Sequence, residues 1–532
     1  MVDIAEYPFS LEYANNPAFK QLDYDWPIVY LIKWERYVYI WETYNPYKRT
    51  KEHLKNEERK VLNKMFVFYD NEYNKSATLD IESQLIQYVA AEESVILQNK
   101  NEGLRDHEYF DRETYLAKFE TIWKELQKRK IVTKDLNEIR NSDLFKYSPY
   151  KALSTDQYEV VSSIYDEIES WKIWTYIVNG EPWTWKSIVA SYLMKYFKSK
   201  KETKHLKIWL VVPMAWLRST FKKVFKNIDG LNSSMVIWPN DLAKDYNDTN
   251  KVPYDIIIVD ESHRLQKRKS ITNYKAYDDV NKKLGLSPES TQLDWVLNLS
   301  NTQILLYDSN QSIRPADVNE NDFSKIQSAQ YYELKSQMRV KWWNEYLSFV
   351  SALFDWWNSK FDQIKNYDFK LYDDFSEFRK AIFSRDKEFR LSRIVAWYAR
   401  PRRSKDNPNE YDIEIDWIKM FRNSANTDRV NSRNALEEIW CVHTIQWYDL
   451  NYVWVILWEE LSYNKETWEF IIKKENYYDK KWKMWVDSEY ELKRYIINIY
   501  KTLLTRGILW TYVYVVDKDL REYLKSKVVL NG

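Results

Sequence analysis

Glycine is the residue that this sequence lacks most: the 532 residues include only 6 glycines. An average composition of about 7% would give roughly 37. Because glycine alone enters positive φ freely, a fold with many turns is hard to build with so few. Tryptophan, the residue least able to replace it, occurs 26 times. The deficit and the excess therefore suggest a common cause.

Three further absences narrow the class of protein. The single cysteine, Cys441, excludes a disulfide framework and points to a reducing compartment. No apolar run approaches the roughly 18 residues of a membrane span, and the start "MVDIAEYPFS" lacks the basic, then apolar, layout of a signal peptide. The net charge of +1 favours neither nucleic acid nor membrane through global electrostatics. We therefore expect a cytoplasmic protein with no membrane partner.

Apolar runs rich in β-formers alternate with amphipathic or polar segments from about residue 155 onward. These runs are "TYIVNG", "KIWLVVPM", "YDIIIVDES", "TQILLYDSN", "RIVAWYARP", "NYVWVILWEE" and "TYVYVVDKD". Buried runs spaced in this way predict an α/β fold whose parallel sheet carries helices on both faces. Earlier in the chain we expect two β-rich runs around a turn in "PIVYLIKWERYVYIWET", residues 27–43, a charged helix over "NPYKRTKEHLKNEERKVLNKMF", a helix over 78–98 and a charged helical arm over 110–150.

The stretch "NGEPWTWKS" has the outline of a phosphate-binding loop, with Gly180, four residues, one further position and then Lys186 and Ser187. It lies between a predicted strand and an amphipathic helix, the context in which backbone N–H groups and a helix N-terminus hold phosphates. Lys186 would reach the β and γ phosphates, and Ser187 would hold Mg²⁺. The candidate ATP-binding residues of this loop are Gly180, Glu181, Pro182, Trp183, Thr184, Trp185, Lys186 and Ser187.

Two carboxylates follow the next strongly aliphatic run, "YDIIIVDESHRL". Strand geometry would deliver Asp260 and Glu261 to the carboxyl edge of the sheet. Asp260 would bind Mg²⁺ through water, and Glu261 would orient and deprotonate the attacking water. The alternative is a pair of acidic residues that simply caps a strand end, and the preceding phosphate loop favours the catalytic interpretation.

Four further polar residues follow the same order along the chain. Gln311 follows a buried strand and suits a sensor of the γ-phosphate, and Arg339 and Arg506 are candidates for stabilising charge in the transition state. Gln157, upstream of the loop, carries a side-chain amide that suits adenine. Each alone is an ordinary polar residue, and only the ordered set indicates function.

The region from about 155 to 525 resembles superfamily 1-type helicase ATPases with two RecA-like lobes, and more closely the Schlafen-like bacterial helicase/ATPase family. The resemblance rests on "LVVPMAWLRSTFKKVF", "VDESHRLQKRK", "YDSNQSIRPADV", "HTIQWYDLNYVWVILWEEL" and "LLTRGILWTYVYVVD". It implies ATP and Mg²⁺ as cofactors, with DNA or RNA as the partner.

The stretch "VYLIKWERYVYIWETYNPYKRTKEHL" resembles the GIY-YIG endonuclease module. Tyr30 and Tyr39 occupy its two motif tyrosines, Arg49 and His53 lie on the following helix, and Glu82 matches the helical glutamate that binds a divalent metal. The resemblance implies metal-assisted phosphodiester cleavage, in which a tyrosine or its neighbour activates water, Arg49 steadies the phosphate and Glu82 holds Mg²⁺. The alternative is a two-stranded hairpin with an aromatic core.

Tryptophans stand at glycine positions of both family patterns. They are Trp41, Trp185, Trp216, Trp342, Trp343, Trp397, Trp447, Trp454, Trp458 and Trp510. In one interpretation the protein is a decayed ATPase, and the indoles of Trp183 and Trp185 fill the space meant for phosphates. In the other, the source organism decodes UGA as glycine, as some bacteria with reduced genomes do, and UGA was translated here as tryptophan. Because the charged motif residues are untouched, the second is favoured; Trp123 and Trp295 then fit as genuine tryptophans.

Together these features predict four segments: a nuclease-like domain over 1–108, a helical connector over 109–152, a first lobe with Walker A and B over 153–335 and a second lobe with the arginine finger over 336–532. The fold class is α/β, with a small α+β domain before two RecA-like parallel-sheet lobes. We expect an ATP-dependent translocase or helicase coupled to an endonuclease, and no activity from the literal tryptophan-containing chain. A nucleotide-dependent switch acting on proteins, for example in phage defence, or a non-catalytic scaffold are the alternatives.

Overall fold

The structure is a computed structural model of the whole chain. It describes residues 2–15, 26–57, 59, 61–99, 112–170, 172, 174–180, 184, 186–246, 252–269, 271, 273–308, 316–326, 328–334, 343–354, 367–397, 403–404, 407, 409–422, 436–441, 450–476 and 488–528.

The first domain is built on a five-stranded sheet with the order β1-β4-β2-β3-β5. Its elements are β1 (Asp3–Pro8), α1 (Leu11–Ala14), β2 (Ile28–Trp34), β3 (Tyr37–Thr43), α3 (Pro46–Leu54), β4 (Lys64–Tyr69), α4 (Lys75–Ala90) and β5 (Ile96–Leu97). The two β-rich runs predicted in residues 27–43 are confirmed, since β2 pairs with β3 in antiparallel register.

Two helix predictions in this domain are wrong at their ends. The charged helix ends at Leu54, and its expected last turn belongs to β4. The run "KMFVFY" is a strand because it pairs with β1 on one side and β2 on the other and buries four consecutive side chains. The helix expected over 78–98 ends at Ala90, and β5 occupies part of the remainder.

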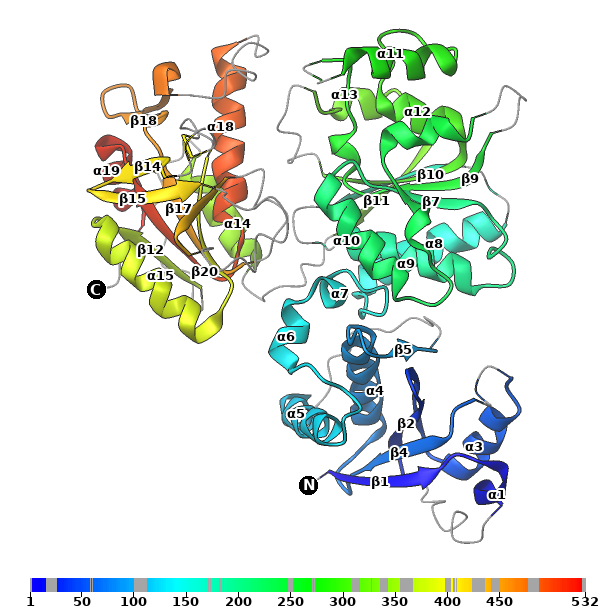
Figure 1. Cartoon of the computed structure of the whole chain (residues 1–532). Helices are drawn as coiled ribbons and strands as arrows, with labels where there is room; N and C mark the ends of the chain where they lie inside the picture. Colours follow the sequence, from blue (N-terminus) through cyan, green and yellow to red (C-terminus); the bar gives the residue numbers. More distant parts are fainter. Residues whose placement is uncertain are drawn as a thin grey trace.

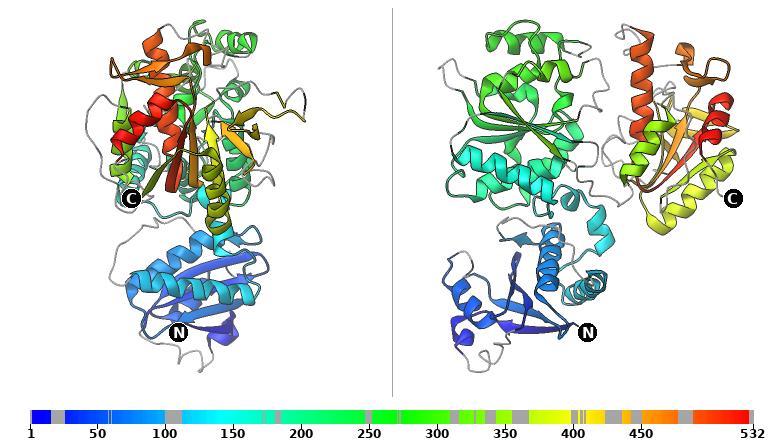
Figure 2. Two further views of the ribbon diagram at one scale, coloured as in Figure 1. Left: turned by 90° about the vertical axis from the view of Figure 1, so that its left-hand side faces the viewer. Right: turned by 180° about the vertical axis from the view of Figure 1, so that it is seen from behind.

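A helical connector follows, with α5 (Arg112–Lys128), α6 (Leu136–Asn141) and α7 (Asp143–Lys146). It joins the first domain to the next lobe, because Phe119 and Trp123 of α5 pack on Tyr88 of α4, and α7 contacts both α4 and α10. One hydrophobic core extends without a break from Val2 through this connector to Leu334. Figures 1 and 2 show the connector between the two bodies.

The first lobe is an all-parallel six-stranded sheet with the order β11-β6-β10-β9-β7-β8. Its strands are β6 (Thr175–Gly180), β7 (Ile208–Val211), β8 (Val236–Ile237), β9 (Tyr254–Val259), β10 (Ser300–Tyr307) and β11 (Ala329–Leu334). Its helices are α8 (Thr155–Glu169), α9 (Lys186–Ser199), α10 (Ala215–Lys226), α11 (Tyr274–Lys283), α12 (Gln292–Leu299) and α13 (Glu320–Phe323).

Helices cover both faces of this sheet, with α8, α9 and α10 on one side and α11, α12 and α13 on the other (Figure 1). Alternate side chains of one strand enter the two cores: Ile256 and Ile258 face the first, and Ile257 and Val259 face the second. This two-sided burial explains why the strands are continuous aliphatic runs in the sequence.

The second lobe carries a seven-stranded sheet with the order β12-β20-β17-β13-β16-β15-β14, parallel except for the β14–β15 hairpin. Its strands are β12 (Asp368–Tyr372), β13 (Ser392–Ala396), β14 (Ile413–Ile415), β15 (Ile418–Arg422), β16 (Glu438–Cys441), β17 (Leu450–Leu457) and β20 (Gly507–Val515), with a separate hairpin of β18 (Leu461–Asn464) and β19 (Glu469–Ile472). Its helices are α14 (Trp343–Leu353), α15 (Phe375–Phe389), α18 (Glu489–Leu504) and α19 (Lys518–Lys527). This lobe has a core of its own.

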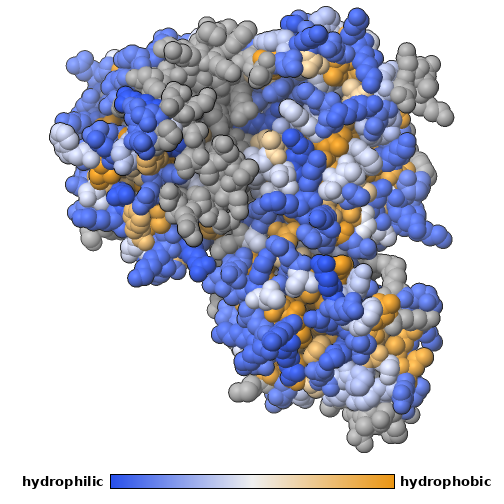
Figure 3. Space-filling model, viewed as in Figure 1, coloured by the Kyte–Doolittle hydropathy of each residue, from blue (hydrophilic) through white to orange (hydrophobic). Residues whose placement is uncertain are grey.

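The predicted fold class is confirmed: two lobes built on parallel sheets follow a smaller α+β domain. Hydrophilic residues cover most of the visible face, and apolar residues form smaller groups between them (Figure 3). Within the described part of the chain, no helix combines the length and the apolar character that a membrane crossing requires.

Candidate functional site

The loop between β6 and α9 closes tightly around Gly180. A Cβ atom on Gly180 would lie 2.3 Å from Thr184 Oγ1 and 3.3 Å from Leu334 Cβ, so only glycine fits here without displacing the loop. Lys186, the first residue of α9, is buried, and its Nζ donates a hydrogen bond to the Gly180 carbonyl at 2.6 Å. Four predicted loop residues lie outside the described residues: Glu181, Pro182, Trp183 and Trp185.

Gln157, near the start of α8, lies against this loop. Its Oε1 accepts a hydrogen bond from the Ser154 backbone N–H at 3.0 Å, and its Nε2 donates to the Thr184 carbonyl at 2.7 Å. Gln157 is fully buried. The Gln157 amide therefore supports the loop through the Thr184 carbonyl. Recognition of adenine by Gln157 stays a prediction.

The two predicted Mg²⁺ ligands of the first lobe are in direct contact. Ser187 Oγ donates a hydrogen bond to Asp260 Oδ2 at 2.7 Å, and Asp260 Oδ1 accepts one from the Glu261 backbone N–H at 3.0 Å. Asp260 follows β9 directly and is fully buried. Burial, reinforced by the neighbouring Glu261 carboxylate, raises the pKa of Asp260 above its ordinary value. A cation at this carboxylate would relieve that cost, so the donor set fits Mg²⁺.

Glu261 adopts a left-handed backbone conformation, with φ 53° and ψ 49°, that turns its side chain toward His263. The Glu261 Oε2 and His263 Nε2 atoms lie 3.0 Å apart. Burial opposes ionisation of Glu261, but His263, Lys186 and Arg264 together bring its pKa below the ordinary range. The adjacent carboxylates thus differ: Glu261 favours the charged form, while Asp260 resists it.

Asp308 belongs to this site and was missed by the sequence interpretation. It follows β10 directly, is buried, and its Oδ2 lies 3.4 Å from Lys186 Nζ. The signal was present, because a carboxylate after the buried run "LLY" repeats the arrangement of Asp260 after β9. The residue predicted to sense the γ-phosphate was Gln311, three positions further on. Both Gln311 and Arg339 lie outside the described residues.

Arg506 lies in the second lobe between α18 and β20. It is buried, and its Nε donates a hydrogen bond to the Thr502 carbonyl at 3.0 Å. Its neighbour Gly507 permits close packing there, since a Cβ atom would lie 2.2 Å from the Trp510 carbonyl oxygen. The arginine-finger role of Arg506 stays a prediction.

The first domain brings its predicted tyrosines and histidine together on β2, β3 and α3. Tyr30 Oη and His53 Nε2 are hydrogen-bonded at 2.6 Å, and the rings of Tyr39 and His53 lie 4.9 Å apart. Burial and the nearby cations Arg59 and Arg49 lower the pKa of His53 to about 3, so its imidazole is neutral at pH 7. Burial, with Tyr39 as a further cause, raises the pKa of Tyr30.

Arg59 is a second residue that the sequence analysis missed. Its guanidinium contacts His53 Nδ1 and lies 3.9 Å from the centre of the Tyr39 ring. It reaches the cluster from the loop between α3 and β4, and no spacing rule in the sequence predicts that approach. Arg49, as predicted, lies on α3; it pairs with Glu52 at 2.7 Å and lies 4.9 Å from the centre of the Trp41 ring.

Glu82 is buried on α4 and is close enough to influence the pKa of Tyr30. The described residues contain no group of three or more His, Cys, Asp or Glu side chains arranged to hold a metal ion. A magnesium ion in either predicted site would therefore have at most two such side chains among its ligands and would rely on water and substrate phosphates for the rest, as Mg²⁺ sites commonly do.

Comparisons with known proteins cover the region that contains the loop around Gly180. Residues 174–517, well over half of the chain, match the model of a family described as Schlafen group 3, DNA/RNA helicase domain. A relative in Saccharomyces cerevisiae, Uncharacterized protein YPL245W, is 25% identical over 392 residues, which cover 66% of this chain and 83% of the relative.

Among solved structures, the arterivirus nonstructural protein 10 helicase is similar with a TM-score of 0.29 and 11% identity over 66% of this chain, and the chain spans only 62% of that helicase. The Pif1 helicase from Candida albicans is similar with a TM-score of 0.28 and 10% identity over 70% of this chain and 96% of its own.

Proposed function

The chain belongs to the Schlafen group 3 DNA/RNA helicase domain family, and on that premise we propose that it couples ATP hydrolysis to movement along DNA or RNA. The observation that supports this most directly is the contact between Ser187 and Asp260, at 2.7 Å. This contact joins the phosphate loop to β9, the strand that ends at Asp260 and Glu261. The same edge of the sheet holds Lys186 against Asp308.

In this proposal each described side chain has a role suited to its environment. Lys186 exchanges its contacts with the Gly180 carbonyl and Asp308 for phosphate oxygens of ATP. Ser187 and Asp260 hold Mg²⁺, which when bound neutralises phosphate charge. Glu261 remains ionised and accepts the proton of the attacking water. Arg506 supplies a positive charge from the second lobe.

We also propose that the tryptophans at glycine positions come from UGA codons that the source organism decodes as glycine. Trp417 supports this, because it is the second residue of the two-residue loop between β14 and β15. Asp416 and Trp417 have φ values of 44° and 68°, a combination for which hairpins strongly prefer Asp-Gly. Trp468 ends the loop between β18 and β19 with φ 60°. These two indoles are 90% and 65% exposed.

The buried tryptophans also fall into two groups, according to whether the indole N–H is hydrogen-bonded. Trp123 Nε1 donates to the Lys134 carbonyl at 3.1 Å, and Trp295 Nε1 donates to Asn281 Oδ1 at 2.5 Å. Both are tryptophans that the sequence analysis regards as genuine. Trp454, assigned there to a glycine position, is fully buried in β17, and no acceptor in the described part of the chain takes its indole N–H. Buried tryptophan usually satisfies that group.

We further propose that the first domain is a metal-dependent endonuclease. The hydrogen bond between Tyr30 and a neutral His53 supports it: Arg59 donates to His53 Nδ1, so the Nε2–H donates to the Tyr30 hydroxyl oxygen and holds it in place. Arg49 and Arg59 supply positive charge for a phosphate, and Glu82 would hold Mg²⁺. A tyrosine of this cluster or its neighbour would orient the attacking water.

The helicase proposal is tested on glycine-restored protein, meaning the chain with glycine at every tryptophan whose codon is UGA. We expect ATP hydrolysis that single-stranded DNA or RNA stimulates, and loss of hydrolysis in Lys186→Ala and Asp260→Asn. The literal chain should neither bind nor hydrolyse ATP. Hydrolysis without any response to nucleic acid would contradict movement along a strand and favour a switch that acts on proteins. UGG codons at 183 and 185 would refute the recoding.

The nuclease proposal has an independent assay on the same protein. Cleavage of labelled DNA and RNA in Mg²⁺ should be lost in Glu82→Ala and retained in Glu93→Ala, whose carboxylate lies on the surface of the same domain. Lys186→Ala should still cut, because it changes only the ATP site. Cleavage by Glu82→Ala at the rate of the parent protein would refute the assignment of the metal ligand.

A further inference from the structure

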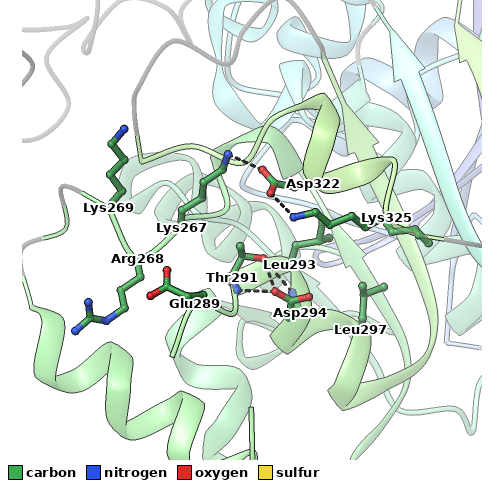
Figure 4. A pocket seen from close by; sticks show the side chains of 11 residues that line it. Lys267, Arg268, Lys269, Glu289, Thr291, Leu293, Asp294, Leu297, Asp322 and Lys325 are labelled. Atoms are coloured by element: carbon green, nitrogen blue, oxygen red, sulfur yellow. Dashed lines mark hydrogen bonds and ion pairs between the residues drawn. The ribbon is translucent and has the colours of Figure 1, made fainter. Parts of the chain in front are cut away.

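A charged cavity of about 410 Å³ lies in the first lobe outside the ATP site (Figure 4). Three segments form it: the loop that follows Asp260 and Glu261, the first part of α12 with the residues before it, and the end of α13 with the residues after it. The lining residues are Lys267, Arg268, Lys269, Glu289, Thr291, Leu293, Asp294, Leu297, Asp322, Lys325 and Ile326.

The cavity lies at the same edge of the sheet as the ATP site. Helix α12 immediately precedes the parallel strand β10 and so runs against it, which puts the beginning of α12 at the carboxyl edge. Lys267 is six positions after Glu261 in the chain, and Asp322 is fourteen positions after Asp308. Both walls of the cavity are therefore direct continuations of the two strands that end in the site's carboxylates.

Two lysines from opposite walls point toward the same place. Lys267 Nζ lies 2.7 Å from Asp322 Oδ2, and Lys325 Nζ lies 3.4 Å from Asp322 Oδ1 (Figure 4). An ammonium group has three donors, so both lysines keep donors for an incoming anion. Lys325 is 75% exposed and Lys267 is 26% exposed, which leaves both within reach of a ligand. Lys269 adds a further cation to the rim, whereas Arg268 is paired with Asp278 at 2.6 and 2.9 Å and Glu289 adds a carboxylate to the lining.

The other side of the cavity is apolar. Leu293 and Leu297 come from α12, and Ile326 comes from the segment after α13. Asp294 is occupied as a helix cap, because it accepts hydrogen bonds from the backbone N–H and the hydroxyl of Thr291. Cations beside an apolar wall suit a ligand that combines a phosphate with a flat, weakly polar ring.

We propose that this cavity takes a nucleotide unit of a single nucleic-acid strand, with its phosphates on Lys267, Lys269 and Lys325 and its base on the apolar wall. The assignment rests on the proposed function and specifies where the first lobe contacts the strand. Phosphate contacts of this kind carry affinity without reading sequence.

A buried clamp links this cavity to the ATP site. Arg264 donates to Asp317 Oδ2 at 2.6 Å, the Lys267 N–H donates to the Ala316 carbonyl at 2.7 Å, and the Val318 N–H donates to the Leu265 carbonyl at 2.9 Å. These contacts connect the segment after β9 to the segment after β10, between the site's carboxylates and the cavity.

The test measures binding of a fluorescent single-stranded oligonucleotide to the full chain without ATP, over a range of salt concentrations. The double variant Lys269→Gln/Lys325→Gln should bind about tenfold more weakly, and its salt slope should fall by about 0.7 for each phosphate that the variant no longer neutralises. The matched control is Lys201→Gln, an exposed lysine in the turn after α9. It should keep both the affinity and the slope.

The outcomes separate the cavity from the wider proposal. Equal binding by the parent and the double variant overturns the cavity and leaves the helicase proposal intact. No nucleic-acid binding by the parent overturns both. Adenosine monophosphate serves as the free-nucleotide probe. If the double variant no longer binds adenosine monophosphate but binds the oligonucleotide as the parent does, the cavity holds a free nucleotide and the strand assignment is wrong.

Discussion

Glycine at position 417 should stabilise the β14–β15 hairpin. A non-glycine residue in the left-handed region costs roughly 1–2 kcal/mol, and Trp417 adopts φ 68° there. Glycine also increases the entropy of the unfolded chain, which offsets about 0.4–1 kcal/mol. Because the indole is 90% exposed, Trp417→Gly gives up little packing. We therefore expect a net gain of about 0.5–1 kcal/mol in the free energy of local opening.

Hydrogen exchange of the β15 amides measures that local free energy. A gain of about 1 kcal/mol slows exchange roughly fivefold. Trp417→Ala is the matched control, because it also removes the indole but keeps a Cβ atom at positive φ; it should not slow exchange. Equal exchange in the two variants would refute the argument from backbone strain.

By contrast, Trp295→Gly should lower stability by at least about 3–5 kcal/mol in thermal unfolding, since that indole is fully buried and hydrogen-bonded.

Three other predictions follow from described contacts. In glycine-restored protein, Gly180→Ala should weaken ATP binding about tenfold or more in calorimetry, because its Cβ atom would lie 2.3 Å from Thr184 Oγ1; unchanged affinity would contradict the loop geometry. Asp317→Ala should cost about 3–5 kcal/mol of unfolding free energy in denaturant titration, since it removes the carboxylate that receives the buried Arg264. Glu92→Gln should lower the melting temperature at pH 7. Burial opposes ionisation of Glu92, but hydrogen bonds from the Thr133 hydroxyl and the Thr133 and Lys134 backbone lower its pKa. The parent's advantage should therefore be full above the ordinary glutamate pKa of about 4.3 and be lost as pH falls through the lowered pKa; a constant difference would refute it.

The parallel sheets were predictable because their strands are buried on both faces. All seven apolar runs from "TYIVNG" to "TYVYVVDKD" are strands, and their carboxyl ends bring Ser187 and Asp260 into contact. The first three residues of "KMFVFY" were wrongly assigned to the end of the charged helix, because so short an apolar run carries no periodicity that separates strand from helix. Only its pairing with β1 and β2 decides the matter.

The two hairpins of the second lobe were missed for a different reason. A short loop is recognised in a sequence by its glycine or asparagine, and "IEIDWIKM" has tryptophan where an Asp-Gly turn would stand. Arg59 was beyond prediction because the folded loop, and not sequence spacing, carries it to His53. Asp308 was within reach, since it follows its strand as Asp260 does.

One core cluster joins the first domain, the connector and one face of the first lobe, from Val2 to Leu334, whereas the second lobe has a separate core. The proposed nuclease residues and the proposed phosphate loop therefore lie in the part of the chain that shares this core. Under the two proposals, the length of strand between cutting and ATP hydrolysis would be set within that part of the chain and not by the second lobe.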